Sequence, residues 1–193
     1  MLQDREWTLE KVVSGGQTGA DQAGLRAART MGIATGGWVP FGCVTEEGPN
    51  PALAAQFGLK EMESDKYPPR TEANVRDSDG TMRFAANFNT AGERCTLKAL
   101  KWFDKPYFDV DVKKPPTIEG AVTWIVNNKV KVLNIAGNRE STNPGIGSFV
   151  EQYLACVFAY LIPVERMQKM CVERLGQSPP LPKPLCLMRR AMQ

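Results

Sequence analysis

A glycine-rich turn near the beginning of the chain carries the residues best suited to binding an anion. Val12 and Val13 suit a buried strand, and from Ala20 onward small and apolar residues recur at helical spacing. A glycine-rich turn before a helix exposes backbone N–H groups where the helix dipole is positive. A tight connection without a ligand is the alternative, but the polar side chains favour a phosphate-like ligand. The candidate binding residues of this turn are Ser14, Gly15, Gly16, Gln17 and Thr18.

This turn does not match the two common phosphate-binding motifs. No Lys follows the glycines, as a Walker A loop requires, and Ser-Gly-Gly-Gln-Thr-Gly has a different spacing from G-x-G-x-x-G. The turn is therefore predicted to bind an anion through backbone N–H groups and short polar side chains.

The amino-acid composition limits the chemistry. The chain contains no histidine, which excludes Ser–His and Cys–His catalysis and the common His-based metal sites. Five scattered cysteines form no C-x-x-C pair, so we expect a reducing environment and no protein-ligated metal. Acidic residues within positions 1–6 argue against a secretory or transit segment, and we expect a cytoplasmic protein.

Two later turns also lie between a predicted strand and a predicted helix. Residues 88–96 follow a strand at 81–87, and residues 137–145 follow a strand at 131–136. In a parallel sheet such turns converge at the carboxyl ends of the strands, so we expect one anion pocket. These turns add the candidates Thr90, Gly92, Thr96, Gly137 and Gly145, and Trp38 either covers the ligand or packs at the edge of the core. Cationic residues near the turns, either ligand-binding or solvated, are Arg94, Lys98 and Arg139.

Predicted strands and helices alternate along most of the chain. This alternation predicts an α/β fold with a parallel sheet and helices on both of its faces. Residues 42–69 contain many glycines and prolines and are predicted to be irregular. We expect a single ligand-binding domain over residues 1–163 and an extended, Pro-rich C-terminal extension over residues 164–193.

The last predicted helix, residues 146–162, is apolar on nearly all of its sides. One sheet covers only one side of such a helix, so we expect the other side to lie in a homo-oligomer. Burial of that side by the C-terminal extension is the alternative. The helix is too short, and too polar at Glu151 and Gln152, to span a membrane.

The first turn resembles the S-G-G-x-x-G-x-D turn of the lysine-decarboxylase-like (SLOG) Rossmann proteins, which include cytokinin-activating phosphoribohydrolases, DNA-processing proteins and molybdenum cofactor carriers. Four segments together resemble the molybdenum cofactor carriers and, more broadly, the circularly permuted branch of this group. These segments are residues 12–21, 36–38, 70–80 and 133–146. The resemblance implies a Rossmann-like fold, a tetramer, and molybdenum cofactor (molybdopterin) as the bound ligand.

The phosphoribohydrolases differ from this chain at one important position. Their arginine nine residues before an aspartate corresponds to Arg70 and Asp79, so the resemblance assigns Arg70 to the ligand and allows Asp79 to brace the site. Asp77 and Asp79 are otherwise expected to be turn or capping residues rather than a metal pair. When their P-G-G-x-G-T-x-x-E turn is aligned through Thr96, Ala99 stands in place of the catalytic glutamate. Without this acid and without histidine, we predict no hydrolase activity.

Two classes of function therefore remain. The first is a non-catalytic carrier that binds, stores and protects molybdenum cofactor for transfer, with molybdoenzymes or cofactor-synthesis proteins as partners. The second is a nucleotide-binding or phosphoribohydrolase-like enzyme. A DNA-binding module is a weaker third alternative, because the net charge is only +3 and no basic stripe is present. We expect neither nucleic acid nor membrane as a partner, and Ala99 and the lack of histidine favour the carrier.

Overall fold

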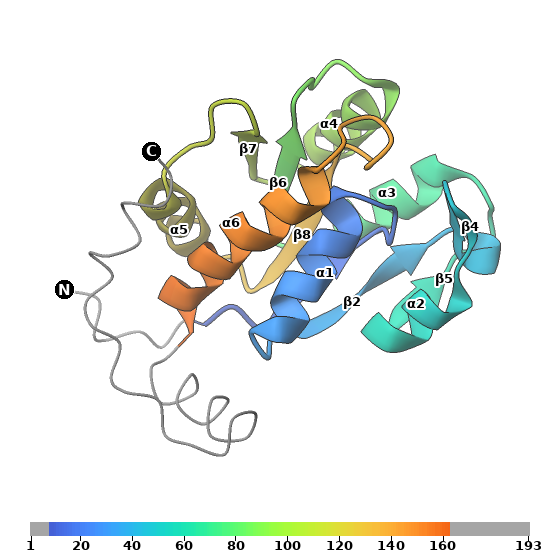
Figure 1. Ribbon diagram of the computed structural model, residues 1–193, viewed down its shortest axis with the longest axis horizontal. Helices are drawn as coiled ribbons and strands as arrows, with labels where there is room; N and C mark the ends of the chain where they lie inside the picture. Colours follow the sequence, from blue (N-terminus) through green and yellow to red (C-terminus); the bar gives the residue numbers. More distant parts are fainter. Residues whose placement is uncertain (1–7, 163–193) are drawn as a thin grey trace. The chain divides into compact units, whose positions relative to one another are not determined.

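Six parallel strands form one sheet in the computed structural model, which describes residues 8–162 (Figure 1). Their spatial order is β5-β2-β1-β8-β6-β7, and every neighbouring pair runs parallel. The strands are β1 (Lys11–Ser14), β2 (Ala34–Val39), β5 (Leu59–Glu61), β6 (Gly80–Ala85), β7 (Tyr107–Asp111) and β8 (Val132–Gly137). The predicted α/β fold with a parallel sheet is confirmed.

Helices cover both faces of this sheet. They are α1 (Ala20–Thr30), α2 (Pro51–Phe57), α3 (Tyr67–Arg76), α4 (Ala91–Trp102), α5 (Ile118–Asn127) and α6 (Ile146–Leu161). The chain moves in opposite directions across the sheet after β1 and after β6, and right-handed crossovers then place the connecting helices on opposite faces. Accordingly, α6 packs against α1 and α5 on one face, and α3 packs against α4 on the other (Figure 1).

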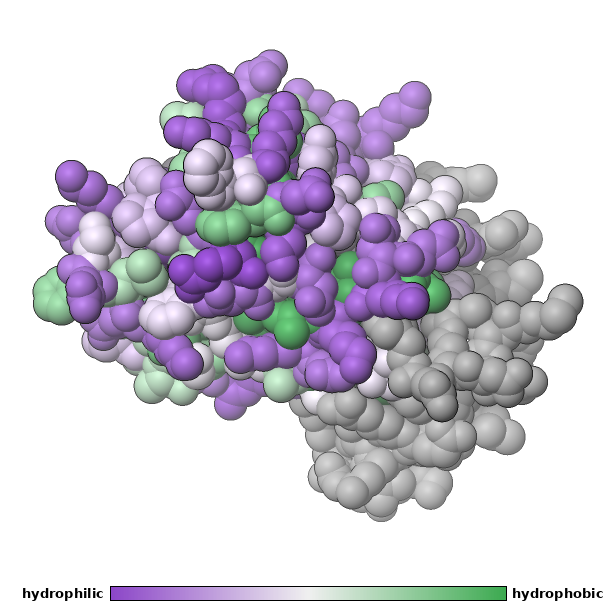
Figure 2. Space-filling view, turned by 180° about the vertical axis from the view of Figure 1, so that it is seen from behind, coloured by the Kyte–Doolittle hydropathy of each residue, from purple (hydrophilic) through white to green (hydrophobic). Residues whose placement is uncertain are grey.

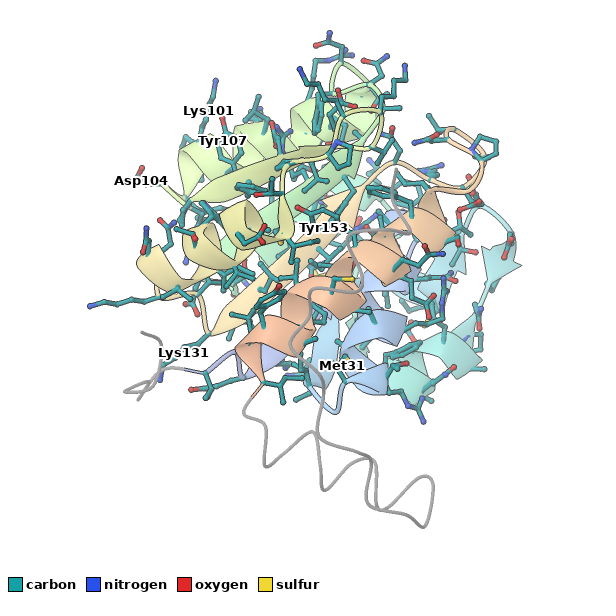
Figure 3. All side chains as sticks on the ribbon, turned by 60° about the vertical axis from the view of Figure 1, so that its left-hand side comes forward. Met31, Lys101, Asp104, Tyr107, Lys131 and Tyr153 are labelled. Carbon is teal, nitrogen blue, oxygen red and sulfur yellow. The ribbon has the colours of Figure 1, made fainter. Side chains whose placement is uncertain are left out.

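The core lies between the central strands and these helices. Val12, Met82, Phe84 and Ile135 are fully buried because helices cover both sides of their strands. On the α6 side, Tyr153 points inward (Figure 3), where its ring meets Phe84 edge to face at 5.7 Å and its hydroxyl donates to a backbone carbonyl. The opposite face, seen from behind in Figure 2, is mainly hydrophilic with small apolar patches.

Residues 42–69 contain regular elements, so the prediction of an irregular loop is wrong. They include a short hairpin, β3 (Val44–Thr45) with β4 (Gly48–Pro49), then α2 and β5, and a 3-10 turn, η1 (Phe41–Cys43), overlaps their start. The Asn50 side chain accepts the Leu53 N–H and caps α2, Pro51 occupies its first turn, and Gly58 ends it in a left-handed conformation. The Pro and Gly residues here start and stop a short helix rather than prevent one.

Asp79, three residues after the end of α3, lies at the edge of the sheet where the strands begin. The Asp79 carboxylate accepts the N–H groups of Lys131 and Val132 at 2.9 and 2.7 Å, at the start of β8. Figure 3 places Lys131 at this edge. Asp79 thus lies in the turn between α3 and β6, as expected, and outside the lining of the cavity described below.

Residues 8–161 belong to one compact unit. No helix within residues 8–162 is both long enough and apolar enough to cross a membrane. The predicted C-terminal extension, residues 164–193, lies outside the described residues.

Candidate ligand-binding site

A cavity of about 500 Å³ lies at the carboxyl end of the sheet. The turns after β1, β6 and β8 all contribute to it, together with the first turns of α3 and α4. All strands of a parallel sheet end at the same edge. From β1 the chain continues to β2, and from β6 it continues to β7, so the direction in which it crosses the sheet reverses between β1 and the strands β8 and β6. The predicted convergence of three turns is confirmed, and the volume suits a small-molecule ligand.

The structure separates the predicted site residues into two groups. Those that line the cavity are Gln17, Arg70, Thr90, Gly92, Thr96 and Gly137. Those that lie outside its lining are Ser14, Gly15, Gly16, Thr18, Trp38 and Gly145. The Trp38 indole N–H instead donates to Asp77 at 2.8 Å, and its ring lies under the ammonium group of Lys60.

The turn after β1 is held by bonds within the protein. Ser14 Oγ donates to the Ile135 carbonyl at 2.7 Å, joining β1 to β8. The Thr18 hydroxyl donates to the Glu46 carboxylate, and Gln17 Oε1 accepts the N–H groups of Thr18 and Glu46. The hydroxyl groups expected to contact a ligand thus have partners in the protein.

Both glycines of this turn are needed for close packing. A Cβ on Gly15 would lie 1.3 Å from Arg70 Nη1, so only glycine lets the guanidinium lie against the turn. Gly16 has a φ of +71°, and a Cβ there would meet Val39 and Leu59 at 2.9 and 3.2 Å. A side chain at position 16 would therefore enter an apolar cluster rather than the cavity.

A buried ion pair joins α1 to α3 beneath the cavity. Arg70 Nη1 donates to Asp21 Oδ2 at 3.0 Å, and the two side chains are 12% and 5% exposed. Burial raises the pKa of Asp21, although the positive charge of Arg70 opposes this shift. Arg70 Nε is buried without a hydrogen-bond partner. In the sequence Asp21 is only the last position of the S-G-G-x-x-G-x-D turn, and an acid in the first turn of a helix is common.

A second cation lies at the rim of the cavity. The guanidinium groups of Arg70 and Arg139 lie over the Tyr67 ring, 5.7 and 4.7 Å from its centre. Gln17 Nε2 donates to the Tyr67 hydroxyl at 3.3 Å and holds the ring in place. Within the described residues Arg139 makes no ion pair, so its charge is available to an anionic ligand.

Glu93, in the first turn of α4, was not predicted as a site residue. The pattern Thr90-x-x-Glu93 is typical of a capping box, and Thr90 Oγ1 does accept the Glu93 N–H at 3.3 Å. Glu93, however, is one of the residues that line the cavity, and its Oε1 accepts from Asn138 Nδ2 at 3.3 Å. Burial raises the pKa of Glu93 to about 7. Nothing in the sequence distinguished it from an ordinary capping residue.

Arg83 of β6 lies behind Glu93 and is 2% exposed. Its Nε and Nη2 donate to the Asp109 carboxylate at 2.8 and 2.6 Å, and Nη1 donates to the Glu93 carbonyl at 3.3 Å. Its charge is thus shared between two acids. In the sequence Arg83 only interrupts an apolar strand, and a charged residue in a buried strand was the available signal.

The N-termini of α1, α4 and α6, which follow the three turns, are not equally open to a ligand. The Glu140 carboxylate accepts the N–H groups of Gly145 and Gly147, which closes the start of α6. At the start of α1, the Ala20 N–H donates to the Asn138 carbonyl. In the first turn of α4, Thr90 accepts the N–H groups of Glu93 and Arg94. The N–H groups of Ala91 and Gly92 have no acceptor within residues 8–162, and a Cβ on Gly92 would meet nothing within 4 Å. The start of α4 is therefore open to a ligand.

The position aligned with the catalytic glutamate of the phosphoribohydrolases faces the core. Ala99 is buried and packs with Val75 and Leu100. Two other acidic residues nevertheless line the cavity, Asp21 in the first turn of α1 and Glu93 in the first turn of α4. Within residues 8–162 no three acidic or cysteine side chains lie close enough together to hold a metal ion.

Comparisons with known proteins agree with this architecture. No curated protein matches the chain. A crystal structure of a "putative molybdenum carrier protein" from Syntrophus aciditrophicus matches it with 37% sequence identity and a TM-score of 0.71. The match covers 80% of this chain and 98% of that one. Residues 12–158 match the circularly permutated YpsA SLOG family, and they include every turn that lines the cavity. The chain therefore belongs to the circularly permutated YpsA SLOG family.

Proposed function

We propose that this protein is a cytoplasmic, non-catalytic carrier that binds molybdenum cofactor, stores it and protects it for transfer to molybdoenzymes. Its similarity to the protein named a "putative molybdenum carrier protein" supports the class of ligand. The observation that carries the proposal is the mixed charge of the cavity, which combines Arg70 and Arg139 with Asp21 and Glu93. A pterin that carries a phosphate offers both hydrogen-bond donors and an anionic group, and so matches such a cavity.

The phosphate is expected to bind between Arg139 and the start of α4. The open N–H groups and the dipole of α4 favour an anion by roughly 0.3–1 kcal/mol. A charge-assisted hydrogen bond from a guanidinium adds about 1.5–3 kcal/mol. The molybdenum and its dithiolene form part of the cargo, so no protein ligand to the metal is required.

Anaerobic titration of released cofactor into the full chain tests this proposal. Gly92→Asp places a carboxylate at the start of α4, where a Cβ has free space. We expect this variant to fold normally and to lose cofactor binding, because the new negative charge repels the phosphate. Gly92→Asn is the matched control of equal size and should keep most of the affinity. Equal affinity of Gly92→Asp and wild type, or oxidation of the cofactor at the same rate with and without protein, would refute the proposal.

The carrier is proposed to be a homotetramer that uses the outer side of α6. The inner side of this helix is buried, whereas its outer side presents Ala155, Cys156, Ala159 and Tyr160, with Tyr160 39% exposed. These largely apolar residues suit contact with a second copy. Light scattering of the full chain at micromolar concentration should give four times the monomer mass, and a monomer mass would contradict this part of the proposal.

A nucleotide hydrolase is the second candidate, and Glu93 favours it. A carboxyl group with a pKa of about 7 lines the cavity, and such a group can act as a general acid or base near neutral pH. Release of free base from adenosine monophosphate or a cytokinin monophosphate decides between the candidates. Turnover near one per second that Glu93→Gln abolishes would establish the enzyme and refute the non-catalytic carrier.

A further inference from the structure

One oxygen of the Glu93 carboxylate has no hydrogen-bond partner within the described residues. Oε1 accepts from Asn138, but Oε2 accepts from no donor, and Arg83 Nη1 lies 3.6 Å from it, beyond hydrogen-bond distance. The Glu93 side chain is only 3% exposed. A buried carboxylate oxygen without a hydrogen-bond donor is unfavourable, so Oε2 is available to a donor on a ligand.

The charged groups around the Glu93 carboxylate disfavour an anion directly beside it. Arg83 of β6 faces it, but Arg83 is also bound to Asp109 of β7. Asp21 of α1 and Asp109 add negative charge that raises the pKa of Glu93, and the Asn138 amide after β8 is neutral. The phosphate of a ligand would meet repulsion here. An uncharged N–H or O–H donor would meet an acceptor.

Arg70 supplies the complementary group in the same cavity. Its Nη1 is bonded to Asp21, but its Nε is buried and donates to no acceptor. Two buried atoms of residues that line the cavity thus lack hydrogen-bond partners, the acceptor Glu93 Oε2 and the donor Arg70 Nε. A ligand that fills both positions needs N–H groups on one edge and an acceptor on another.

We propose that Glu93 determines ligand specificity by accepting hydrogen bonds from the N–H edge of a heterocycle, a ring N–H beside an exocyclic amino group. This inference rests on the proposed function, in which that edge is the 2-amino and N3–H edge of a pterin. A purely structural role as a capping-box acid does not explain the geometry, because the carboxylate is directed to Asn138 and the cavity instead of back to the start of α4.

Two phosphate esters that differ in one group test the proposal on the full chain at pH 8. They are 6-hydroxymethylpterin monophosphate and the corresponding lumazine, in which a carbonyl oxygen replaces the 2-amino group. We expect wild type to bind the pterin about tenfold or more tightly than the lumazine, because the lumazine places an acceptor against a carboxylate. Glu93→Gln should bind both esters within about threefold, because an amide can donate as well as accept.

Glu119→Gln is the matched control. Glu119 also lies in the first turn of a helix, α5, but it is exposed and does not line the cavity. This variant should keep the wild-type preference. Because the pKa of Glu93 is about 7, the preference of wild type should also weaken as the pH falls from 8 to 6, and that of Glu93→Gln should not change.

The outcomes separate this inference from the function on which it rests. Equal wild-type affinities for the two esters would overturn the inference and leave the pterin carrier intact. A preference that survives in Glu93→Gln would assign recognition to another residue and also overturn it. Binding of adenosine monophosphate with no binding of either ester would refute the proposed function itself.

Discussion

The turn after β1 and the turn that begins α4 have similar sequences but different roles. Both combine glycine with small polar residues after a strand and before a helix. In the β1 turn, the hydroxyls of Ser14 and Thr18 bond to the protein itself. In the α4 turn, Gly92 faces open space and Glu93 retains an unpaired oxygen. We therefore expect the first turn to support the cavity and the second to present groups to a ligand.

The difference shows that polar residues in a glycine-rich turn do not by themselves identify a ligand contact. A hydroxyl or N–H group donates well to an anionic ligand only when its hydrogen is not already bonded to a protein acceptor, and buried polar groups nearly always have partners. The β1 turn lies where β1, β8 and the β3–β4 hairpin meet, so its groups bond to these neighbours.

Gly37→Ala should cause the largest loss of stability, because Gly37 packs closely against Ser14 at the start of the β1 turn. Gly37 has a φ of +128°, and a Cβ would lie 2.2 Å from the Ser14 carbonyl oxygen, which the backbone cannot easily yield. We expect the free energy of unfolding to fall by about 3 kcal/mol or more, measured by chemical denaturation. Gly48→Ala is the control, because Gly48 has a φ of +107° with nothing within 4 Å. Similar losses in both variants would show that backbone strain alone is responsible.

Glu93→Gln should change the pH dependence of stability. The pKa of the Glu93 side chain is about 7 in the folded protein, against 4.5 for a free side chain. The folded state therefore binds the proton more tightly, and the associated stability is present below pH 4.5 and lost as the pH rises through 7. The shift corresponds to roughly 3 kcal/mol. The free energy of unfolding, measured by chemical denaturation at pH 5 and pH 8, should fall less between these two pH values in the variant than in wild type. An equal loss in both would mean that Glu93 ionises normally and is not the desolvated acceptor described above.

Arg139→Gln should weaken ligand binding without affecting the fold. Arg139 makes no ion pair among the described residues, and its removal takes away a charge that faces the cavity. We expect the affinity for a pterin phosphate ester to fall about tenfold, measured by calorimetry. Arg94→Gln serves as the control, because Arg94 is exposed and lies outside the cavity lining, and it should bind within about twofold of wild type. If both variants lost affinity equally, general surface charge would be responsible.

Ser14→Ala should have the smallest effect and tests the β1 turn as a scaffold directly. It removes the bond from Ser14 to the Ile135 carbonyl, so stability should fall by about 1 kcal/mol. Ligand affinity should stay within about twofold of wild type, because this hydroxyl faces β8 and not the cavity. A tenfold loss of affinity with unchanged stability would place Ser14 in contact with the ligand and remove the distinction between the two turns.

The sequence by itself determined the fold class and the edge of the sheet at which the site lies. Apolar strands alternating with helices favour a parallel sheet covered on both faces. Local caps also depend on neighbouring residues, as at α5, where the Thr117 hydroxyl accepts the Gly120 N–H. Gly and Pro in residues 42–69 were misread as irregular, since the same residues also start and end short helices.

Only the tertiary structure decided which polar groups remain unpaired. Ser14 meets Ile135 across 121 residues of chain, and Arg70 meets Asp21 across 49. Glu93 reads as a helix cap in sequence but becomes a desolvated acid when Arg83, Asn138 and Asp21 close around it. Hydrogen bonding and desolvation depend on neighbours that folding brings from distant segments. Local sequence patterns cannot specify those neighbours.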